Sequence, residues 1–318
     1  MEKCPHQNTI GILYPGEMGT SFGKLLCEAG FRVITTVEGR SPRTHRLCCE
    51  AGLSTVDSLD EVLKHSDVVI SLVSPAAALS VARNVAAHIK GSTRTLLYVD
   101  ANSISPMTVT QISEALRHVP VDVVDASIFV LASQLRQRGI LYLSGLRAKE
   151  LADQFGPLLR VKTVGDMPGQ ASALKLIISG MTKGLNGLFV EQMLFAQNMH
   201  LLNEALETCD EIYPSIMEVI RRLLPTYPQH ARRRCEELQE IEATMLTSGL
   251  TPRIVCAVRE VIFALGSAGW SNREPQQWTI AEIITQIHSQ GMLEMTHAQI
   301  DEAQTSGADS RCEAAVNR

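Results

Sequence analysis

Residues 167–200, MPGQASALKLIISGMTKGLNGLFVEQMLFAQNMH, form the stretch on which the organisation of this chain depends. Pro168 and Gly169 mark the start of a predicted helix, and no later proline interrupts it. A helix of about 30 residues is roughly 45 Å long. Apolar residues surround it on almost every side, which is typical of a helix buried within a protein.

Four polar side chains interrupt the apolar surface in the first half of this helix. Lys175, Ser179, Thr182 and Lys183 are spaced i, i+4, i+7 and i+8, so they share one face. A lysine on an apolar helix shifts its pKa readily, which makes Lys175 and Lys183 candidate acids or bases. An isolated lysine more often reaches solvent or pairs with a carboxylate. The sequence upstream therefore has to decide between these interpretations.

The composition indicates a globular protein with two domains. The chain has 318 residues, 45% of them hydrophobic and 20% charged, with a net charge of −5. This charge gives no indication of nucleic-acid binding, and the longest uncharged apolar stretch, 68–82, is too short to span a membrane. Eight cysteines without zinc or disulfide spacing favour a reducing, cytoplasmic compartment, and no metal site is predicted.

The N-terminal residues predict a strand, a glycine turn, a helix and a second strand. Strands are expected at 9–14 and 31–37, with the helix ending near residue 29. Gly16 would let the backbone approach a pyrophosphate, Gly19 would let the helix pack on the sheet, and the helix N-terminus would attract phosphate. The residues assigned to this cofactor-binding turn are Tyr14, Pro15, Gly16, Glu17, Met18 and Gly19. Because Tyr14 occupies the place of the first glycine, the turn alone is equally compatible with a plain tight turn.

The residues after the second strand bear on the choice of cofactor. Glu38 would hold the ribose hydroxyls of NAD(H), whereas Arg40 with Ser41 would accommodate the 2′-phosphate of NADP(H). Two arginines and a hydroxyl within 40–43 favour NADP(H), with NAD(H) left open. The alternative is an exposed turn of ordinary charges.

The alternation continues and predicts an α/β fold, a Rossmann-type doubly wound parallel sheet. Further strands are expected at 53–56, 67–73, 95–100, 121–126, 140–143 and 160–164, with helices at 43–51, 58–65, 76–88, 106–117 and 147–157. Ligands of such sheets bind beyond the carboxyl ends of the strands. That edge contains Ser74, Pro75, Asn102, Ser103 and Ser127, each of which could instead be a helix cap or turn residue.

These elements divide the chain into a Rossmann domain at 1–166 and an all-α C-terminal domain at 167–300. Residues 301–318 are expected to be a disordered tail. Helices with apolar stripes are expected at 201–224, 232–246, 254–268 and 280–292. These helices look too apolar to stand alone, so we expect them to associate in a homodimer rather than a monomeric bundle.

Four motifs in order resemble the β-hydroxyacid dehydrogenases, relatives of 6-phosphogluconate and 3-hydroxyisobutyrate dehydrogenases. They are GILYPGEMG at 11–19, VDANSISP at 99–106, DASIFV at 125–130 and GQASALKLIISG at 169–180. Residues of about 195–268 resemble the helical C-terminal domain of a less characterised branch of this family. The resemblance implies an NAD(P)-dependent oxidoreductase acting on a small molecule.

By this resemblance, Lys175 is the acid/base on the substrate hydroxyl or carbonyl, with a pKa expected to be lowered towards neutrality. Gly16, Met18 and Gly19 match the pyrophosphate turn, and Arg40 and Ser41 the 2′-phosphate site. Ser74, Pro75 and Asn102 match positions near the nicotinamide. We expect a further set of residues to hold or polarise the substrate: Asn102, Ser127, Ser179 and Lys183.

Two departures from the family pattern fall at the substrate. The anchoring loop continues as Ser127-Ile128-Phe129-Val130 instead of a serine with two glycines, and Ser179 replaces an asparagine. The sequence therefore leaves open the substrate, the direction of reaction and any decarboxylation. It also leaves open which arginine among Arg221, Arg222, Arg232, Arg233 and Arg234 would bind a carboxylate. An imine reductase and a non-catalytic NADP(H)-binding sensor or scaffold are the alternatives, although retention of the lysine argues against the first.

Overall fold

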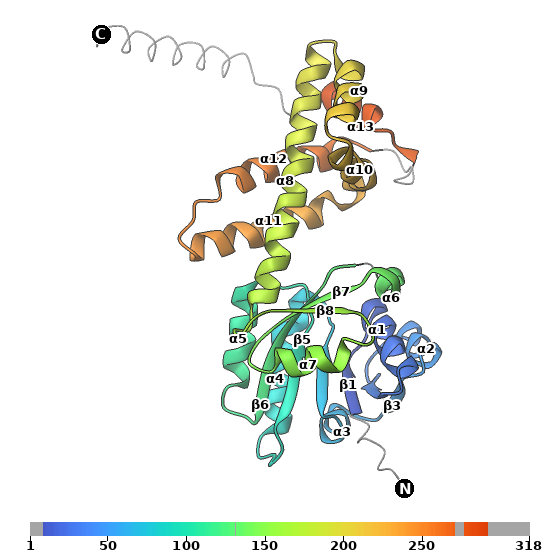
Figure 1. Cartoon of the computed structure of the whole chain (residues 1–318), viewed down its shortest axis with the longest axis vertical. Coiled ribbons are helices and arrows are strands. Elements are labelled where there is room, and N and C mark those ends of the chain that lie inside the picture. Colours follow the sequence, from blue (N-terminus) through green and yellow to red (C-terminus); the bar gives the residue numbers. More distant parts are fainter. Residues whose placement is uncertain (1–8, 131, 271–276, 292–318) are drawn as a thin grey trace, which may run out of the picture. The chain divides into compact units, whose positions relative to one another are not determined.

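The computed structural model describes residues 9–130, 132–270 and 277–291. The chain forms two compact units, Met1–Ser179 and Gly180–Arg318. Their boundary falls inside the long helix α8 (Gln170–Asn198), whereas the sequence placed a domain boundary at the start of that helix (Figure 1). The single uninterrupted helix is confirmed. The tail expected at 301–318 lies outside the described residues.

The first unit is built on one eight-stranded sheet with the order β3-β2-β1-β4-β5-β6-β7-β8. The strands are β1 (Thr9–Leu13), β2 (Arg32–Thr36), β3 (Ser54–Val56), β4 (Val68–Ser71), β5 (Leu96–Asp100), β6 (Val121–Ile128), β7 (Ile140–Ser144) and β8 (Arg160–Gly165). This order confirms the doubly wound fold class. One pairing departs from the expected parallel sheet, because β7 runs antiparallel to β6. The short connection at 129–139 returns to the sheet beside β6, without the longer crossover that a parallel pair requires.

Helices cover both faces of this sheet (Figure 1). They are α1 (Glu17–Glu28), α2 (Pro42–Glu50), α3 (Leu59–His65), α4 (Pro75–Ile89), α5 (Pro106–Leu116), α6 (Leu135–Arg138) and α7 (Ala148–Phe155), with a 3-10 turn at Ala132–Gln134. Ser58 and Ser105 are the N-caps of α3 and α5, and the side chain of each accepts a hydrogen bond from a backbone N–H of the first turn. The turn and α6 at 132–138 were not predicted from the sequence.

The period-two alternation of the strands divides the apolar core into two layers. Ile10 and Ile12 face a layer that includes Phe22 of α1 and Phe155 of α7. Leu13 faces the opposite layer, which packs against α3, α4 and α5. Gly11 lets α3 approach β1 closely, since a Cβ atom there would lie 2.7 Å from Val62 Cγ1 and 2.6 Å from Ser66 Oγ.

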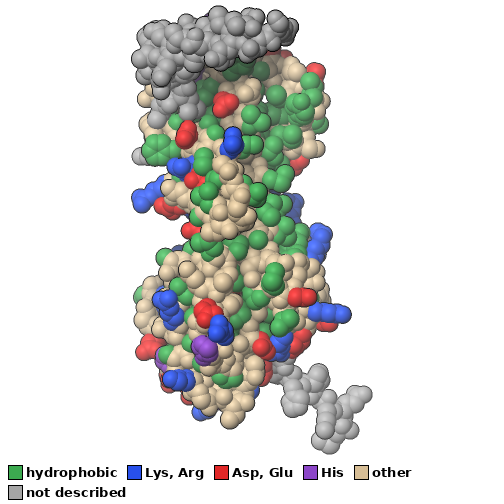
Figure 2. Space-filling view, turned by 90° about the vertical axis from the view of Figure 1, so that its left-hand side faces the viewer, with side chains coloured by type: hydrophobic (Ala, Val, Ile, Leu, Met, Phe, Trp, Pro, Cys, Tyr) green, Lys and Arg blue, Asp and Glu red, His purple; other side chains and the backbone are tan. Residues whose placement is uncertain are grey.

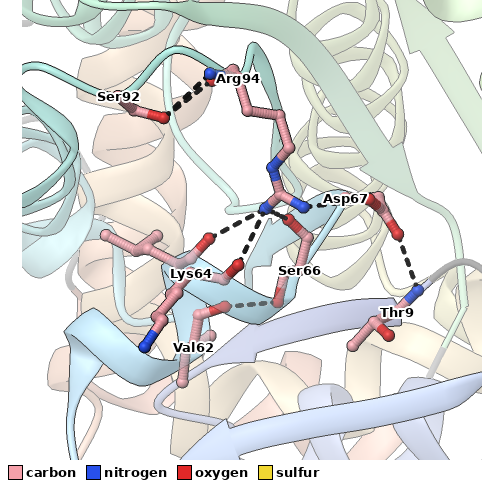
Figure 3. Close-up of polar contacts among 8 residues, drawn as sticks. Thr9, Val62, Lys64, Ser66, Asp67, Ser92 and Arg94 are labelled. Carbon is pink, nitrogen blue, oxygen red and sulfur yellow. Dashed lines mark hydrogen bonds and ion pairs between the residues drawn. The ribbon is translucent and has the colours of Figure 1, made fainter.

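Arg94 forms hydrogen bonds at the edge of the sheet where β1, β4 and β5 begin (Figure 3). Its guanidinium forms an ion pair with Asp67 at 3.2 Å, and the other oxygen of Asp67 accepts the Thr9 N–H at 3.0 Å. It also donates to three backbone carbonyls at the end of α3, those of Leu63, Lys64 and Ser66. These carbonyls lack partners within the helix, so Arg94 stabilises the helix end opposite the ligand-binding edge.

The second unit is all-helical in the part of the chain that the structure describes. It contains the rest of α8 with α9 (Leu202–Ile212), α10 (Pro214–Leu223), α11 (Tyr227–Thr247), α12 (Arg253–Ser267) and α13 (Ile280–Ser289), and a 3-10 turn at Leu224–Thr226. The single helix expected at 201–224 is wrong. Pro214 has no backbone N–H to continue the helix, so α9 ends before Tyr213 and α10 begins at Pro214. Residue 292, the expected end of the last helix, lies outside the described residues.

Close backbone packing holds the second unit together. A Cβ atom at Gly266 of α12 would lie 2.5 Å from the Ala231 Cβ of α11, and one at Gly187 of α8 would lie 3.0 Å from Val258. Among the helices that the structure describes, none is both long and apolar enough to cross a bilayer. Within the described residues, no group of three His, Cys, Asp or Glu side chains could hold a metal ion.

Candidate nucleotide and catalytic site

The glycine turn joins β1 to the N-terminus of α1. Gly16 is the N-cap of α1, and a Cβ atom added there would meet nothing within 4 Å, so the backbone faces open space. At Gly19 a Cβ atom would lie 2.9 Å from Pro15 Cβ of the turn and 3.6 Å from Ile12 Cγ2 of β1, so the glycine lets α1 pack closely against the turn. The free N–H groups of the first turn of α1 and this open space suit a pyrophosphate.

Tyr14 takes the left-handed backbone conformation that a glycine would adopt at the first position of the turn. Its φ is 46°, and it lies directly after β1. For a tyrosine this conformation costs about 1 kcal/mol or more. A tyrosine thus adopts a backbone conformation that favours glycine, which the sequence did not predict.

The end of β2 brings several predicted cofactor residues beside this turn. The Arg40 guanidinium carbon lies 6.0 Å from the centroid of the Tyr14 ring. Burial raises the pKa of Tyr14, Glu38 raises it further, and Arg40 acts against both. Ser41 caps α2 by accepting the Thr44 N–H at 3.4 Å, so its hydroxyl already has a structural role. Contact of these residues with a nucleotide stays a prediction.

Asn102 ties together the ends of β4 and β5. Its Oδ1 accepts the Val73 N–H at 2.7 Å, and its Nδ2 donates to Asp100 Oδ2 at 2.9 Å and to Ser71 Oγ at 3.0 Å. The side chain is 2% exposed, and both of its polar atoms are engaged within the protein. Asn102 thereby fixes the loop that carries Ser74 and Pro75.

Ser74 and Pro75 begin α4 at this edge. Ser74 is the N-cap, but its side chain forms no capping hydrogen bond. The sequence left a cap and a ligand-binding role equally open for Ser74; the residue takes the cap position without a capping hydrogen bond, and the ligand-binding role stays a prediction. Pro75 takes the first helical position, where its missing N–H needs no partner.

Asp125 anchors the first turn of α8 to β6. One carboxylate oxygen accepts the N–H groups of Gly169 and Ser172, both at 2.9 Å, and the Ser144 hydroxyl at 3.1 Å. The other accepts the Ser172 hydroxyl at 2.6 Å. Burial raises the pKa of Asp125, and these hydrogen bonds oppose the shift. No role was predicted for Asp125, although an aspartate is the last or the next-to-last residue of each of two neighbouring predicted strands.

Lys175 lies one helical turn beyond Ser172, and its Nζ donates to Ser103 Oγ at 2.9 Å. The structure thus brings the predicted acid/base to the loop that follows β5.

Ser127 lies two residues beyond Asp125 on β6, so the two side chains share a face of the sheet. Its Oγ is buried and has no hydrogen-bond partner among the described residues, which fits a group supplied by a ligand.

The remaining predicted catalytic residues follow Lys175 along α8. Ser179 is half-buried at the end of the first unit. Lys183 belongs to the second unit, is 5% exposed, and forms an ion pair with Glu237 at 2.8 Å. Pairing with a carboxylate was the alternative interpretation of this lysine. The catalytic roles of Ser179 and Lys183 stay predictions.

The five arginines that the sequence offered as candidates for binding a carboxylate also differ in their partners. Arg221, Arg232 and Arg233 form ion pairs with Asp210, Glu236 and Glu237. Arg222 is exposed on α10. Arg234 stacks on the Tyr227 ring with 3.6 Å from its guanidinium carbon to the centroid, and its Nη1 is buried without a partner in the described part of the chain.

The doubly wound sheet, the glycine turn and the buried polar edge define a nucleotide-binding domain of the dehydrogenase type. Residues 9–129 match the NAD binding domain of 6-phosphogluconate dehydrogenase. Residues 196–265 match a domain of unknown function, DUF1932. These two matches agree with the resemblance seen in the sequence: a region similar to the NAD binding domain of 6-phosphogluconate dehydrogenase is followed by a region similar to DUF1932.

Proteins similar to most of this chain include some without an assigned activity. An uncharacterised 28.5 kDa protein of Methanothermus fervidus is 29% identical over 252 residues, 77% of this chain and 94% of the relative. The solved structure of the conserved protein MTH1747, described as similar to 3-hydroxyacid dehydrogenases, has 29% identity and a TM-score of 0.70. That match covers 80% of this chain and 95% of MTH1747.

More distant structures share the fold alone. Mycobacterium tuberculosis 3-hydroxyisobutyrate dehydrogenase has a TM-score of 0.69 at 14% identity, covering 89% of this chain and 99% of the enzyme. An imine reductase variant from Myxococcus stipitatus has a TM-score of 0.55 at 16% identity, covering 89% and 100%. Together the comparisons support an oxidoreductase that uses a nicotinamide cofactor.

Asp100 gives the stability of the sheet unit a pH dependence. Burial raises the pKa of Asp100 from 3.8 to about 7, even though two hydrogen bonds from Asn102 lower it. An acid with a raised folded-state pKa binds its proton more tightly when folded. Its contribution to the free energy of unfolding is therefore full below its ordinary pKa and is lost as the pH rises through about 7.

We predict that Asp100→Asn removes this loss. Between pH 5 and 8 the wild type should lose stability relative to the variant, by about 1.4 kcal/mol for each unit of pKa shift that is titrated. Urea unfolding at a series of pH values measures the difference. Asp153→Asn, an exposed carboxylate on α7, is the control. Parallel stability curves for Asp100→Asn and the wild type would contradict the prediction.

Proposed function

We propose that this protein is an NADP(H)-dependent oxidoreductase that moves hydride between the nicotinamide and a hydroxyl or carbonyl substrate. The hydrogen bond from Lys175 Nζ to Ser103 Oγ, at 2.9 Å, is the observation that carries the proposal. In this hydrogen bond the Lys175 amine lies beside the loop after β5, at the carboxyl edge where ligands of doubly wound sheets bind, which supports a role as acid/base. The match of residues 9–129 to a dehydrogenase NAD-binding domain supports the same conclusion.

Residues of this chain would bind the cofactor, transfer the proton and bind the substrate. The N–H groups at the start of α1 would bind the pyrophosphate, and Arg40 the 2′-phosphate. Lys175 Nζ would take the proton from a substrate hydroxyl during oxidation and return it to a carbonyl oxygen during reduction. The Ser127 hydroxyl, buried without a partner among the described residues, would bind a polar group of the substrate. The nicotinamide, when bound, supplies or accepts the hydride.

The preference for NADP(H) rests on the charges at the end of β2. Arg43 forms an ion pair with Glu17, whereas Arg40 forms no ion pair with any described carboxylate. A 2′-phosphate next to Arg40 would supply the missing negative charge. Glu38 is the residue that would instead bind the ribose of NAD(H).

Imine reduction is the second candidate function. An imine reductase shares the fold, and the residues after Ser127 depart from the substrate loop of the hydroxyacid dehydrogenases. Phe129 there packs edge-on against Tyr142, with 4.9 Å between the ring centroids, which makes this loop apolar. A lysine suited to proton transfer at a hydroxyl favours the first candidate over this one.

Replacing Lys175 tests the catalytic assignment. Lys175→Met should lower kcat by roughly 10²- to 10⁴-fold, the usual contribution of an acid/base, while NADPH still binds as in the wild type. Turnover would be measured with NADP⁺ and a panel of hydroxy acids, and with NADPH and panels of ketones and cyclic imines. Lys149→Met, an exposed lysine on α7, is the matched control. Wild-type turnover by Lys175→Met would refute the assignment, and turnover of imines alone would favour the second candidate.

Replacing Arg40 tests the cofactor preference. We expect the wild type to bind NADPH at micromolar concentration and NADH much more weakly, as followed by nicotinamide fluorescence. Arg40→Ala should raise the Kd of NADPH about tenfold or more with little change for NADH, because it removes a charge-assisted contact to phosphate. Arg43→Ala, whose native partner is Glu17, should have a smaller effect. Equal binding of both cofactors by the wild type would assign binding of the ribose to Glu38. Binding of a cofactor without turnover of any substrate, with either NADPH or NADH, would favour a sensor or scaffold.

We also propose that two copies of the chain associate through their helical units. Hydrophobic side chains are visible on the surface over this unit in Figure 2. The large apolar side chains of the unit that are more than half exposed include Met181, Leu188, Phe195, Leu246, Ile254 and Phe263. Exposed apolar side chains in such number favour association, and closed symmetric dimers are the commonest solution. Sedimentation over a dilution series should show a dimer. A monomer at every concentration would contradict the proposal.

A further inference from the structure

The loop after β2 turns Arg40 back towards the end of β1. Gly39 has a φ of 68°, which favours glycine, and the Arg40 N–H donates to the Val37 carbonyl at 3.0 Å. β1 and β2 are parallel neighbours with Gly11 opposite Ile34, so their carboxyl ends lie side by side. The loop therefore brings Arg40 to the residue that follows β1, which is Tyr14.

The backbone and the core together hold the Tyr14 ring. Its left-handed conformation, with a φ of 46°, directs the side chain differently from the extended strand before it. The ring packs against the core layer that contains Leu13 and Ile34, which leaves it half-buried. A ring held in this way has little freedom to move, whereas an arginine side chain is among the most flexible in proteins.

The interaction between the two residues is electrostatic. The Arg40 guanidinium carbon lies 6.0 Å from the ring centroid, at the outer range of a cation–π contact. Burial and Glu38 raise the pKa of the Tyr14 hydroxyl, so at neutral pH the ring is uncharged. Arg40 therefore lies near a neutral aromatic ring. The neighbouring Arg43 instead forms an ion pair with Glu17.

We propose that Tyr14 is a positioning residue that holds the Arg40 guanidinium ready for the 2′-phosphate, so that this tyrosine sets the preference for NADP(H). The inference rests on the proposed function, because it needs a nucleotide at the end of β2. It explains why a strained tyrosine stands at the place of the first glycine. Restricting the arginine before the cofactor arrives reduces the entropy lost on binding.

The test compares the Kd of NADPH and of NADH for the full-length protein and four variants. Leucine tolerates the left-handed conformation as poorly as tyrosine, so Tyr14→Leu removes the ring without relieving the strain. It should raise the Kd of NADPH about three- to tenfold and leave that of NADH within about twofold. Tyr14→Phe keeps the ring and should retain the preference. In the Arg40→Ala background, Tyr14→Leu should have no further effect.

Three results would overturn the inference while leaving the proposed function intact. They are an unchanged NADPH Kd in Tyr14→Leu, an equal loss for NADPH and NADH, and additive effects of Tyr14→Leu and Arg40→Ala. An equal loss would mean that Tyr14 only shapes the phosphate turn that both cofactors share. Failure of the wild type to bind NADPH would instead refute the proposed function. Thermal unfolding of each variant confirms that the binding is measured on folded protein.

Discussion

The carboxylate of Asp125 is the interaction on which the candidate site depends. It accepts four hydrogen bonds at the start of α8 and at the end of β7, from Gly169, Ser144 and both donors of Ser172. A buried carboxylate is stable only when its oxygens are so satisfied. Because Lys175 lies one turn beyond Ser172, the position of its Nζ beside Ser103 follows from this anchor.

Asn102 performs a similar task one strand away. The three hydrogen bonds of its side chain, with Val73, Ser71 and Asp100, join the ends of β4 and β5 and fix the loop that carries Ser74. The polar edge of the sheet is thus held by buried carboxylates and an amide, while Ser127 keeps a buried hydroxyl without a partner among the described residues. This contrast separates residues that build the site from residues left for a ligand, and hydrogen-bond satisfaction is the physical criterion.

Much of the fold was predictable because strand and helix periodicities are local. The strands of the sheet unit, the glycine turn and the uninterrupted α8 all follow from patterns of apolar and polar residues over short windows. The antiparallel β7 and the break at Pro214 were not predicted. The direction of β7 depends on where the connection after β6 returns to the sheet, which is not a local property. Pro214 is a local signal for a helix end, but the apolar stripe around it suggested one continuous helix.

The sequence by itself determined the class of protein, because the order of its motifs and the periodicity of its elements survive without coordinates. It also singled out Lys175 as a lysine on an apolar helix. Only the tertiary structure decided what surrounds these residues: that Tyr14 adopts a glycine-like backbone beside Arg40, that Asp125 anchors α8, and that Lys183 pairs with Glu237. Hydrogen bonds and ion pairs between residues far apart in the chain depend on three-dimensional proximity, which no local pattern encodes.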